Sequence, residues 1–328
     1  MNSKILVERD SMAEKIVVLD GYTLEPEPSG WRELKRFGEL QLFEVTLAEE
    51  VVQRCRDATI VLTNKVAIRK NALSALAGLK YIGVMATGYN VIDVEVARDK
   101  GIIVTNVPHY GTESVAQTTL ALLLELTQRV GHHASKVKDG HWSSSPHFTF
   151  RDFPLIELYD RVMGIIGMGR IGKSVARIAA GFGMRVLGHS RSAFELSYVE
   201  KVELHRLLQE SDVISLHCPL NEETKNLINK NTLAQMKPEA FLLNTARGQL
   251  LDEDALYRAL KNGQLKGAAL DVLQQEPPDR DNPLFQLNNC VITPHFAWGT
   301  VAARKRLMNQ VIKNLESFLV GVPINVVN

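Results

Sequence analysis

The stretch Arg161-Val-Met-Gly-Ile-Ile-Gly-Met-Gly-Arg-Ile-Gly172 decides the fold of this chain, because closely spaced glycines follow an apolar strand and open a helix. Gly167 permits the tight turn, Gly169 lets a pyrophosphate approach the backbone, and Gly172 lets the helix pack closely on the sheet. The helix that we expect over Lys173–Ala180 offers free N–H groups to phosphates at its start. A glycine-rich turn without a ligand is the plainer alternative, but a second strand follows in the order that a dinucleotide-binding unit requires. We therefore predict that a dinucleotide contacts Gly167, Gly169, Arg170, Ile171 and Gly172.

Strand-like and helix-like stretches alternate along nearly the whole chain, which is typical of α/β proteins with parallel sheets. In the second half we expect strands at Arg161–Ile166, Met184–Leu187, Asp212–His217, Ala240–Thr245, Gly267–Asp271 and Val291–Thr293. In the first half we expect strands at Lys15–Leu19, Ile60–Leu62, Tyr81–Met85 and Ile102–Thr105, with helices at Leu47–Arg56 and Asn71–Leu79. The predicted fold class is α/β: two Rossmann- or flavodoxin-like, doubly wound parallel-sheet domains with a cleft between them.

Turn-forming residues at Asn106–Gly111 separate the two series of elements. We predict a smaller, discontinuous substrate-binding domain made of residues 15–107 plus 299–328, which includes a final helix over Thr300–Leu319. Residues 108–298 would form the dinucleotide-binding Rossmann domain. Residues 1–14 form an extension to which we assign no role.

The stretch after this boundary predicts a long helix rich in Ala, Leu and Thr. Thr112 or Ser114 can cap this helix, which runs through Leu126. It is too apolar for a helix with one face in solvent. We therefore expect it to be buried between domains or against a second subunit.

The charge balance excludes several classes of partner. The 328 residues contain 38 Lys+Arg and 37 Asp+Glu, so no overall field attracts nucleic acid or an anionic membrane, and we predict neither as a partner. No apolar run is long enough to span a bilayer, and the N-terminus lacks a signal-peptide pattern. Cys55, Cys218 and Cys290 follow no metal or disulfide spacing, so we expect free thiols and no metal. These features are typical of a cytoplasmic enzyme.

The end of the second strand of the dinucleotide unit selects the cofactor. An acidic residue there would bond the ribose hydroxyls of NAD. Here the chain reads Gly188-His-Ser-Arg-Ser192 and has no carboxylate. Ser190, Arg191 and Ser192 can instead hydrogen-bond a 2′-phosphate, although Arg191 as a solvated surface residue is the alternative. We predict a preference for NADP(H) over NAD(H).

Three polar groups follow later strands, at the sheet edge where ligands gather in open α/β sheets: Arg247, Glu276 and His295. Reduction of a 2-keto acid needs a group that holds the carboxylate, a hydride donor and an acid for the ketone oxygen. The planar guanidinium of Arg247 suits a carboxylate. The imidazole of His295 can donate a proton near neutral pH, and a neighbouring Glu276 would orient the ring and favour its protonated form. Taken singly, each residue is equally compatible with an ordinary core or surface position.

Longer segments of the chain resemble one enzyme family. The chain resembles the D-isomer-specific 2-hydroxyacid dehydrogenases at Gly167–Gly172, Asn244–Gly248, Leu270–Pro277 and Thr293–His295, and the likeness extends from about Lys15 to the C-terminus. It is similar to the glycerate dehydrogenase/hydroxypyruvate (glyoxylate) reductase branch at Ala86–Asp93, Asn106–Gly111, Ser114–Gln117, Phe153–Glu157 and Trp298. Two positions depart from the family pattern: Gln117 replaces a common Glu, and Ser190 replaces the acid of NAD-using relatives.

The resemblance implies roles for particular residues. Arg247, Glu276 and His295 match the family's substrate arginine, assisting glutamate and acid/base histidine. Backbone N–H groups of Thr87 and Gly88 would hold the substrate carboxylate, which a glycine in a turn allows.

The resemblance also places residues around the nicotinamide: Pro219, Thr245, Arg247 and Asp271. Asp271 would lie near the carboxamide, although a turn cap is the alternative for an aspartate at a strand end. Trp298 would narrow the substrate pocket. Family habit, together with the apolar helix after Gly111, implies a homodimer.

These inferences predict NAD(P)H-dependent reduction of hydroxypyruvate to D-glycerate, or of glyoxylate to glycolate, by hydride transfer with His295 as acid/base. A dehydrogenase of another small D-2-hydroxy acid is the first alternative. A non-enzymatic, dinucleotide-sensing module of the corepressor type is the second, and the intact trio disfavours it. Formate dehydrogenases carry Gln where Glu276 stands, and a hydrolase would need a Gly-x-Ser-x-Gly elbow or a zinc spacing that the chain lacks.

Overall fold

The computed structural model describes residues 14–24 and 28–328, and the chain folds into two compact units. Unit 1 runs to Gly111 and resumes at Gly299–Asn328, whereas unit 2 is the continuous stretch Thr112–Trp298. Apart from Glu14, the extension expected at the N-terminus lies outside the described residues.

The first unit boundary lies at Gly111, slightly beyond the expected position at Val107. The loop before it is tied to the C-terminal helix of unit 1, because the Arg306 guanidinium donates to the carbonyl of Tyr110 at 2.9 Å. The Asn314 side chain similarly donates to the carbonyl of Asn106 at 2.8 Å.

Within the described residues, unit 1 contains one parallel five-stranded sheet in the order β2-β1-β3-β4-β5. Its strands are β1 (Glu14–Val18), β2 (Gly38–Leu42), β3 (Ile60–Thr63), β4 (Tyr81–Val84) and β5 (Ile103–Thr105). Its helices are α1 (Pro28–Leu34), α2 (Val51–Arg54), α3 (Lys70–Ala75), α4 (Val94–Asp99) and α11 (Val301–Leu319). The strand order reverses between β1 and β3, as in flavodoxin-like sheets, and ligands gather at such switch points.

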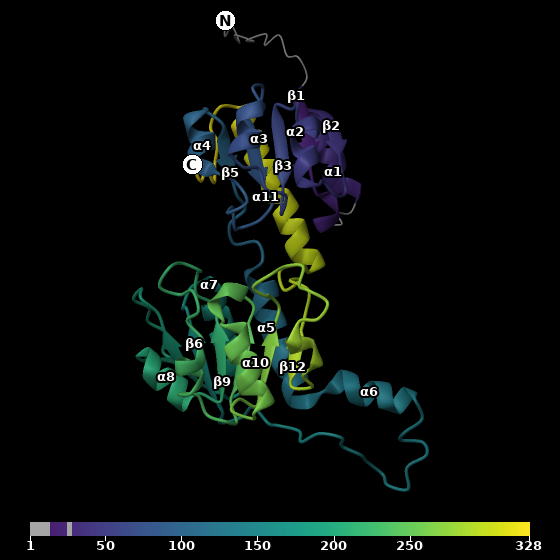
Figure 1. The fold of residues 1–328 in the computed structure, drawn as a ribbon, viewed down its shortest axis with the longest axis vertical. Helices are drawn as coiled ribbons and strands as arrows, with labels where there is room; N and C mark the ends of the chain where they lie inside the picture. The colour runs from purple at the N-terminus through teal and green to yellow at the C-terminus, as the bar shows by residue number, and fades with distance from the viewer. Residues whose placement is uncertain (1–13, 25–27) are drawn as a thin grey trace, which may run out of the picture. The chain divides into compact units, whose positions relative to one another are not determined.

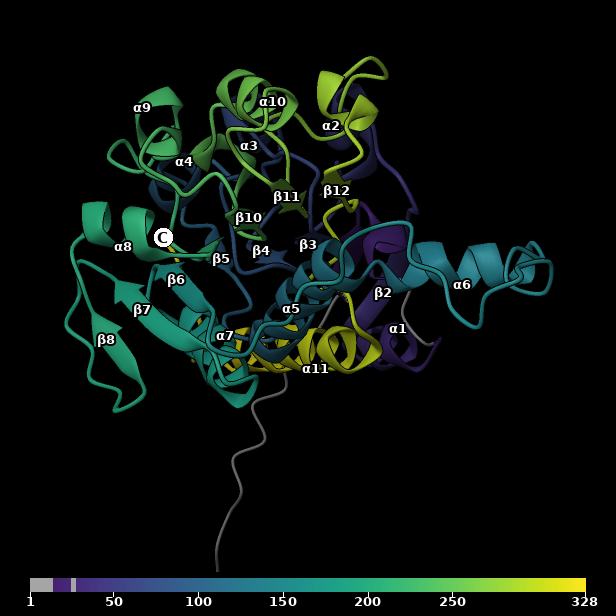
Figure 2. The ribbon, with the colours of Figure 1, turned by 90° about the horizontal axis from the view of Figure 1, so that it is seen from below.

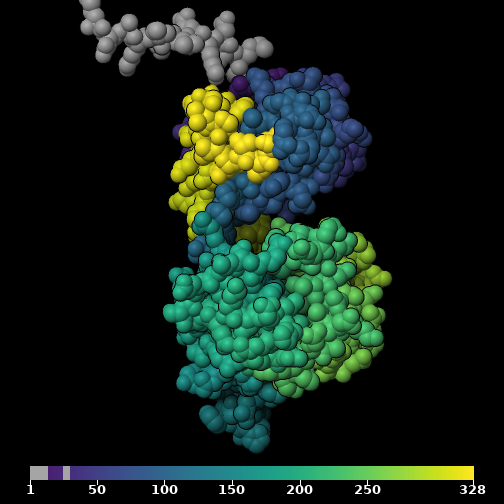
Figure 3. Space-filling view, turned by 90° about the vertical axis from the view of Figure 1, so that its left-hand side faces the viewer, coloured from purple at the N-terminus to yellow at the C-terminus, as the bar shows by residue number. Residues whose placement is uncertain are grey.

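Helix α11 completes unit 1 although it comes from the other end of the chain. Leu307, Val311 and Leu315 of this helix are buried, and the ring of Phe318 lies 4.6 Å from that of Tyr81 on β4. In the space-filling view the helix, in yellow, lies directly against the blue segments of unit 1 (Figure 3). The helix begins where its sequence predicts, since the Thr300 hydroxyl accepts a hydrogen bond from the N–H of Ala303.

Unit 2 contains a seven-stranded parallel sheet among its described residues, in the order β12-β11-β10-β9-β6-β7-β8. Its strands are β6 (Val162–Ile166), β7 (Arg185–His189), β8 (Val199–Lys201), β9 (Val213–Leu216), β10 (Phe241–Asn244), β11 (Gly267–Leu270) and β12 (Cys290–Ile292). Its helices are α5 (Thr112–Gln128), α6 (Val130–Lys138), α7 (Arg170–Gly181), α8 (Leu204–Glu210), α9 (Lys230–Leu233) and α10 (Glu253–Lys261). The order reverses between β6 and β9, as in Rossmann domains.

Helices cover both faces of this sheet (Figures 1 and 2). One apolar cluster joins the sheet to α8, α9 and α10, and a second joins it to α5 and α7. The predicted class, α/β with two doubly wound parallel sheets, is therefore confirmed.

The long apolar helix expected after the boundary is α5, and unit 2 itself accounts for its composition. Leu120, Leu123 and Leu126 of α5 are buried in the cluster that includes α7 and the sheet. Burial within unit 2 therefore explains why α5 is apolar, and a second subunit is not needed to explain it.

A segment that the sequence did not predict follows α5. Helix α6 and the loop that leads to Glu157 project from the rest of unit 2 (Figures 1 and 2). This projecting segment exposes large apolar side chains, which are Val130, Val137, Trp142, Phe148 and Leu155. No helix in the described part of the chain combines the length and apolarity that crossing a membrane requires.

Candidate functional site

The carboxyl ends of the unit 2 strands meet at one edge of the sheet, because all the strands run parallel. Most of the residues singled out in the sequence follow these ends directly. They are the glycines after β6, Ser190–Ser192 after β7, Pro219 after β9, Thr245–Arg247 after β10, Asp271–Glu276 after β11 and His295 after β12.

The turn after β6 uses each of its glycines differently. Gly167 has φ +100°, and a Cβ there would lie 2.5 Å from the backbone nitrogen of Cys218. A Cβ on Gly172 would lie 2.0 Å from the carbonyl oxygen of Gly167, so only glycine allows the helix to pack this closely. Apart from its chain neighbours, no heavy atom of the described residues lies within 4 Å of the position of a Cβ on Gly169, so this backbone is open to a ligand.

Helix α7 begins at Arg170, one turn earlier than the expected start at Lys173, with Gly169 as its N-cap. Gly169 has no side chain to cap the helix, so within the described part of the chain no N-cap side chain occupies the first N–H groups of α7. An open backbone at the start of a twelve-residue helix fits the pyrophosphate of a dinucleotide. Arg170 and Ile171, predicted to contact the cofactor, form the first turn.

Ser190, Arg191 and Ser192 lie on the loop after β7. Arg191 is exposed, and its guanidinium donates to the carboxylate of Glu223 at 2.7 Å. Both side chains are largely solvated, so this ion pair contributes little to stability and can open. The structure thus places a cation and two hydroxyls at this strand end, with Glu223 as a competing partner for Arg191.

Arg247 is exposed on a loop that Asn244 holds in place. The Asn244 amide donates to the carbonyl of Arg247 at 2.8 Å and accepts from the N–H of Ala246 at 3.0 Å. A Cβ on Gly248 would lie 1.9 Å from the carbonyl carbon of Leu273. This close approach brings the loop of Arg247 against the loop that leads to Glu276.

His295 and Glu276 are in direct contact. The Nδ1–H group of His295 donates to Glu276 Oε2 at 2.6 Å, and the other carboxylate oxygen accepts from the N–H of Leu273 at 3.1 Å. A carboxylate only accepts hydrogen bonds, so Nδ1 carries the proton and Nε2 faces away from Glu276. His295 has φ +52°, an uncommon backbone for a residue with a side chain, and such strain is concentrated at functional sites.

Asp271 fixes the loop that carries His295. Its carboxylate is 1% exposed and accepts hydrogen bonds from the Thr293 hydroxyl (2.6 Å) and from the N–H groups of Phe296 (3.1 Å) and Ala297 (2.9 Å). Burial raises the pKa of Asp271, and these donors and His295 pull it the other way. The family resemblance implied a place for Asp271 near the carboxamide. In the structure, its oxygens accept hydrogen bonds from the loop that carries His295.

Two further contacts hold the same loop. The indole N–H of Trp298 donates to the carbonyl of His295 at 2.9 Å, so Trp298 supports His295 directly. On α5, the Ser114 hydroxyl donates to the carbonyl of Ala297 at 2.7 Å. The supporting roles of Asn244 and Ser114 were missed in the sequence, although both stand in the motifs that suggested the family.

The remaining predicted cofactor contacts lie on neighbouring strand ends. Pro219 is exposed after β9, and Thr245 is buried, its hydroxyl 3.0 Å from that of Thr119 on α5. His217 directly follows β9, and its Nε2 is 2.8 Å from the hydroxyl of Ser215. Burial lowers the pKa of His217 to about 3, so this imidazole is neutral.

Thr87 and Gly88 belong to unit 1, on the segment after β4. The Thr87 hydroxyl donates to the carbonyl of Val107 at 2.9 Å, and the Asn106 amide donates to the carbonyl of Thr87 at 2.7 Å. Among the described residues, neither the N–H of Thr87 nor that of Gly88 donates a hydrogen bond. The segment is fixed while two backbone donors remain available.

Known proteins resemble the chain along nearly its whole length. The pattern described as "D-isomer specific 2-hydroxyacid dehydrogenase, NAD binding domain" matches residues 120–297. Over 320 residues the chain is 47% identical to a hydroxypyruvate reductase of Blautia hydrogenotrophica and 40% identical to a glycerate dehydrogenase of Methylorubrum extorquens. Each alignment covers 96% of this chain and 99% of the relative.

Among solved structures, the chain resembles an NADPH-dependent glyoxylate/hydroxypyruvate reductase of Sinorhizobium meliloti in complex with NADP and malonate. The TM-score is 0.83 at 28% identity, and the match covers 96% of this chain and 97% of that structure. Since both the family pattern and the relatives span the glycine turn and the three strand-end residues, the chain belongs to the D-isomer-specific 2-hydroxyacid dehydrogenase family and is an oxidoreductase that uses a nicotinamide dinucleotide.

Proposed function

We propose that this enzyme reduces hydroxypyruvate to D-glycerate and glyoxylate to glycolate, with NADPH preferred over NADH. The observation that carries the proposal is the His295–Glu276 pair, at 2.6 Å, on the same sheet edge as the open glycine turn. The relatives named hydroxypyruvate reductase and glycerate dehydrogenase support the choice of substrates.

Gly167, Gly169 and the start of α7 would hold the nicotinamide dinucleotide, which when bound would supply the hydride for the 2-carbon of the keto acid. His295 gives the ketone oxygen a proton from Nε2, while Nδ1–H stays bonded to Glu276. The carboxylate stabilises the positive charge of the doubly protonated ring before the transfer. In the reverse direction, the neutral ring accepts the proton of the alcohol.

Arg247 holds the substrate carboxylate and polarises the adjacent carbonyl. Its exposed guanidinium extends from a loop whose backbone Asn244 fixes. One of its N–H groups donates to the carbonyl of Ala246 at 2.6 Å, and its remaining planar donors suit a substrate carboxylate. The backbone N–H groups of Thr87 and Gly88 complete the binding of the carboxylate. Arg247→Ala should raise KM and lower kcat/KM by about tenfold or more, because a charge-assisted hydrogen bond is worth about 1.5–3 kcal/mol.

A steady-state panel tests the proposed reaction. The purified protein would be given hydroxypyruvate, glyoxylate, pyruvate and 3-phosphohydroxypyruvate, each with NADPH and with NADH. We expect the highest kcat/KM with hydroxypyruvate or glyoxylate. Turnover confined to pyruvate or the phosphorylated acid would favour another small D-2-hydroxy acid as the substrate.

The preference for NADPH rests on residues 190–192, which directly follow β7 and supply Arg191 and two serines in place of a carboxylate. Arg191→Ala should raise the KM for NADPH by about tenfold and leave that for NADH nearly unchanged. Glu223→Gln should lower the KM for NADPH, because it frees Arg191 from its ion pair. Arg177→Ala, an exposed arginine on α7, is the matched control. Equal effects of Arg191→Ala on both cofactors would contradict the assignment.

We also propose that the enzyme is a homodimer in which the projecting α6 segment contacts the second copy. The support is the exposure of its large apolar side chains, among which Phe148 is 89% exposed. Light scattering during gel filtration measures the mass directly. A monomer at micromolar concentration would refute this part of the proposal.

A further inference from the structure

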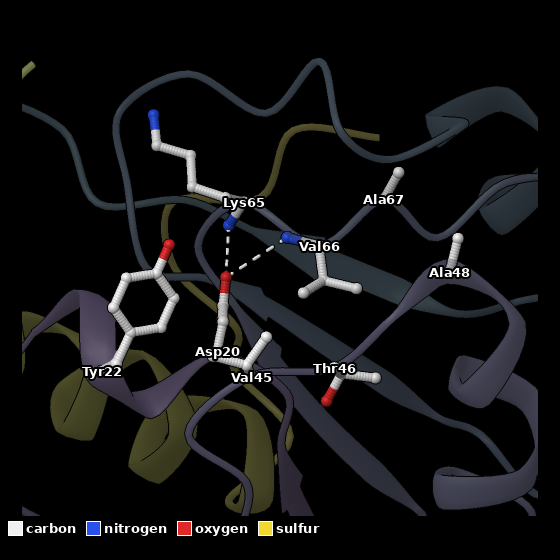
Figure 4. A pocket seen from close by; sticks show the side chains of 8 residues that line it. All are labelled: Asp20, Tyr22, Val45, Thr46, Ala48, Lys65, Val66 and Ala67. Carbon is white, nitrogen blue, oxygen red and sulfur yellow. Dashed lines mark hydrogen bonds between the residues drawn. The ribbon is translucent and has the colours of Figure 1, made fainter. Parts of the chain in front are cut away.

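Unit 1 contains a buried acid that the proposed reaction does not use. Asp20 follows β1, at the switch point of the unit 1 sheet, and it is 1% exposed. Its carboxylate accepts hydrogen bonds from three consecutive backbone N–H groups of the loop after β3, which are those of Asn64 (2.8 Å), Lys65 (2.5 Å) and Val66 (3.2 Å). The bonds to Lys65 and Val66 are drawn in Figure 4, where the side chain of Lys65 extends away from the carboxylate. The contact therefore fixes the backbone of the loop.

The loop that Asp20 fixes is joined to the segment after β4. Ile68 and Ile92 form a parallel bridge, and the N–H of Ile68 donates to the carbonyl of Val91 at 2.9 Å. The Arg69 guanidinium donates to the carbonyl of Asn90 at 2.9 Å and to the carboxylate of Asp93 at 3.0 Å. The positions of residues 90–93 thus depend on residues 68 and 69.

The segment after β4 is held at two ends, and Thr87 and Gly88 lie between them. At the near end, the N–H of Met85 donates to the carbonyl of Thr63 at 2.7 Å, so this end too is tied to the strand that precedes the Asp20 loop. At the far end are the bridge at Ile92 and the bonds of Arg69. A shift of the loop after β3 would therefore move the backbone donors of Thr87 and Gly88.

We propose that Asp20 is a positioning residue for substrate binding: its carboxylate fixes the loop after β3, and that loop fixes the segment that presents the N–H groups of Thr87 and Gly88. The inference rests on the proposed function, in which these two groups bind the substrate carboxylate. Asp20 makes no contact with substrate in this scheme. An acid suits the position, because only a carboxylate offers acceptors alone to three converging donors.

Asp20→Asn tests the proposal with a nearly unchanged side-chain volume. The amide replaces one acceptor oxygen by an NH2 group, which faces backbone donors. We expect the KM for hydroxypyruvate to rise about tenfold, while kcat per folded molecule changes less than about threefold and the Kd for NADPH is unchanged. Amide hydrogen exchange should become faster both in residues 64–70 and in residues 86–93.

Two more variants make the test specific. Arg69→Gln removes the charged hydrogen bonds to Asn90 and Asp93, which join the loop after β3 to the segment after β4. It should raise the same KM. Because the side chain is exposed, this variant remains informative if Asp20→Asn does not fold. Tyr81→Phe is the control, since it removes one buried hydrogen bond of unit 1, to Thr105, without touching either segment. It should lower the melting temperature and leave the KM unchanged.

The outcomes separate this inference from the proposed function. If the unaltered enzyme reduces hydroxypyruvate but both Asp20→Asn and Arg69→Gln keep its KM, the positioning role is wrong and the proposed function stands. A loss of kcat in proportion to unfolded protein, with an unchanged KM, also overturns the role. If the unaltered enzyme turns over none of the keto acids, the proposed function fails and the inference fails with it.

Discussion

The two sheets of this enzyme use the same device at their carboxyl edges, with different results. In unit 1 Asp20 follows β1, and in unit 2 Asp271 follows β11. Each of these residues is 1% exposed, and its carboxylate accepts hydrogen bonds from backbone N–H groups of a loop that follows another strand. The loop that Asp271 holds carries an ionisable side chain, His295. The loop that Asp20 holds contacts residues 90–93 of the segment that also contains Thr87 and Gly88. Under the proposed function, unit 2 would carry the proton chemistry and unit 1 would contribute fixed backbone donors.

His295→Ala should have the largest effect and tests the proton chemistry assigned to unit 2. General acid catalysis contributes about 10²- to 10⁴-fold, so kcat for hydroxypyruvate should fall by about that factor while the Kd for NADPH stays within about twofold. His205→Ala, an exposed histidine on α8, is the control. If His295→Ala keeps more than a tenth of the activity, the assignment of the proton chemistry to unit 2 is wrong.

Gly167→Ala probes the turn that distinguishes the unit 2 edge from that of unit 1. The backbone at φ +100° and the 2.5 Å approach to Cys218 should lower the free energy of unfolding by about 2–3 kcal/mol and weaken NADPH binding. Gly169→Ala is the informative partner, because its φ is −74° and space is open around it. It should fold normally and lose cofactor affinity alone, as calorimetry and a binding titration would reveal. Normal affinity in Gly169→Ala would mean that the pyrophosphate lies elsewhere.

Asp271→Asn should affect a different kinetic constant from Asp20→Asn. An amide at position 271 would set donors against the N–H groups of Phe296 and Ala297, so we expect kcat to fall about tenfold with little change in the KM for hydroxypyruvate. Asp20→Asn should do the reverse. Asp252→Asn, which alters the N-cap of α10, is the control. If Asp271→Asn instead weakens NADPH binding at constant kcat, the carboxamide role that the family resemblance implied explains it better.

The smallest effect is expected at His217, a second histidine on the unit 2 edge. Burial lowers its pKa to about 3, whereas histidine in an unfolded chain has a pKa of about 6.5. As the pH falls, the unfolded chain therefore binds the proton first. The contribution of neutral His217 to the free energy of unfolding is complete above pH about 6.5 and declines below it. From pH 6.5 to 5.5 the free energy of unfolding should decrease by about 1 kcal/mol more in the unaltered protein than in His217→Gln. Urea unfolding at the two pH values measures this; equal decreases would contradict a neutral His217.

The sequence predicts most of what is local in this molecule. The glycine turn, the apolar strands and the strand-end residues Arg247, Glu276 and His295 are visible because each depends on neighbours a few residues away. The start of α7 was placed one turn late, since the first turn of a helix without a side-chain cap leaves little pattern.

What the sequence could not predict depends on distant partners. Strand β2 is a half-exposed edge strand whose alternation is weak, and α6 lacks a buried face, so neither gives a clear periodicity. The roles of Asp20 and Ser114 arise from hydrogen bonds to residues 44 to 46 and 183 positions away, respectively. No spacing rule points to such contacts, because only the tertiary fold brings the groups together.

The return of the chain to unit 1 at Gly299 affects how the protein folds during its synthesis. On the ribosome, the continuous stretch of unit 2 can acquire its interior as soon as it emerges. Unit 1, although its first strand is made earliest, must wait for Leu307, Val311 and Leu315 of α11 before its interior is closed. A nascent chain interrupted before α11 would therefore contain a folded unit 2 and an incomplete unit 1 whose apolar interior is exposed. Chaperones and proteases recognise such exposed apolar surface.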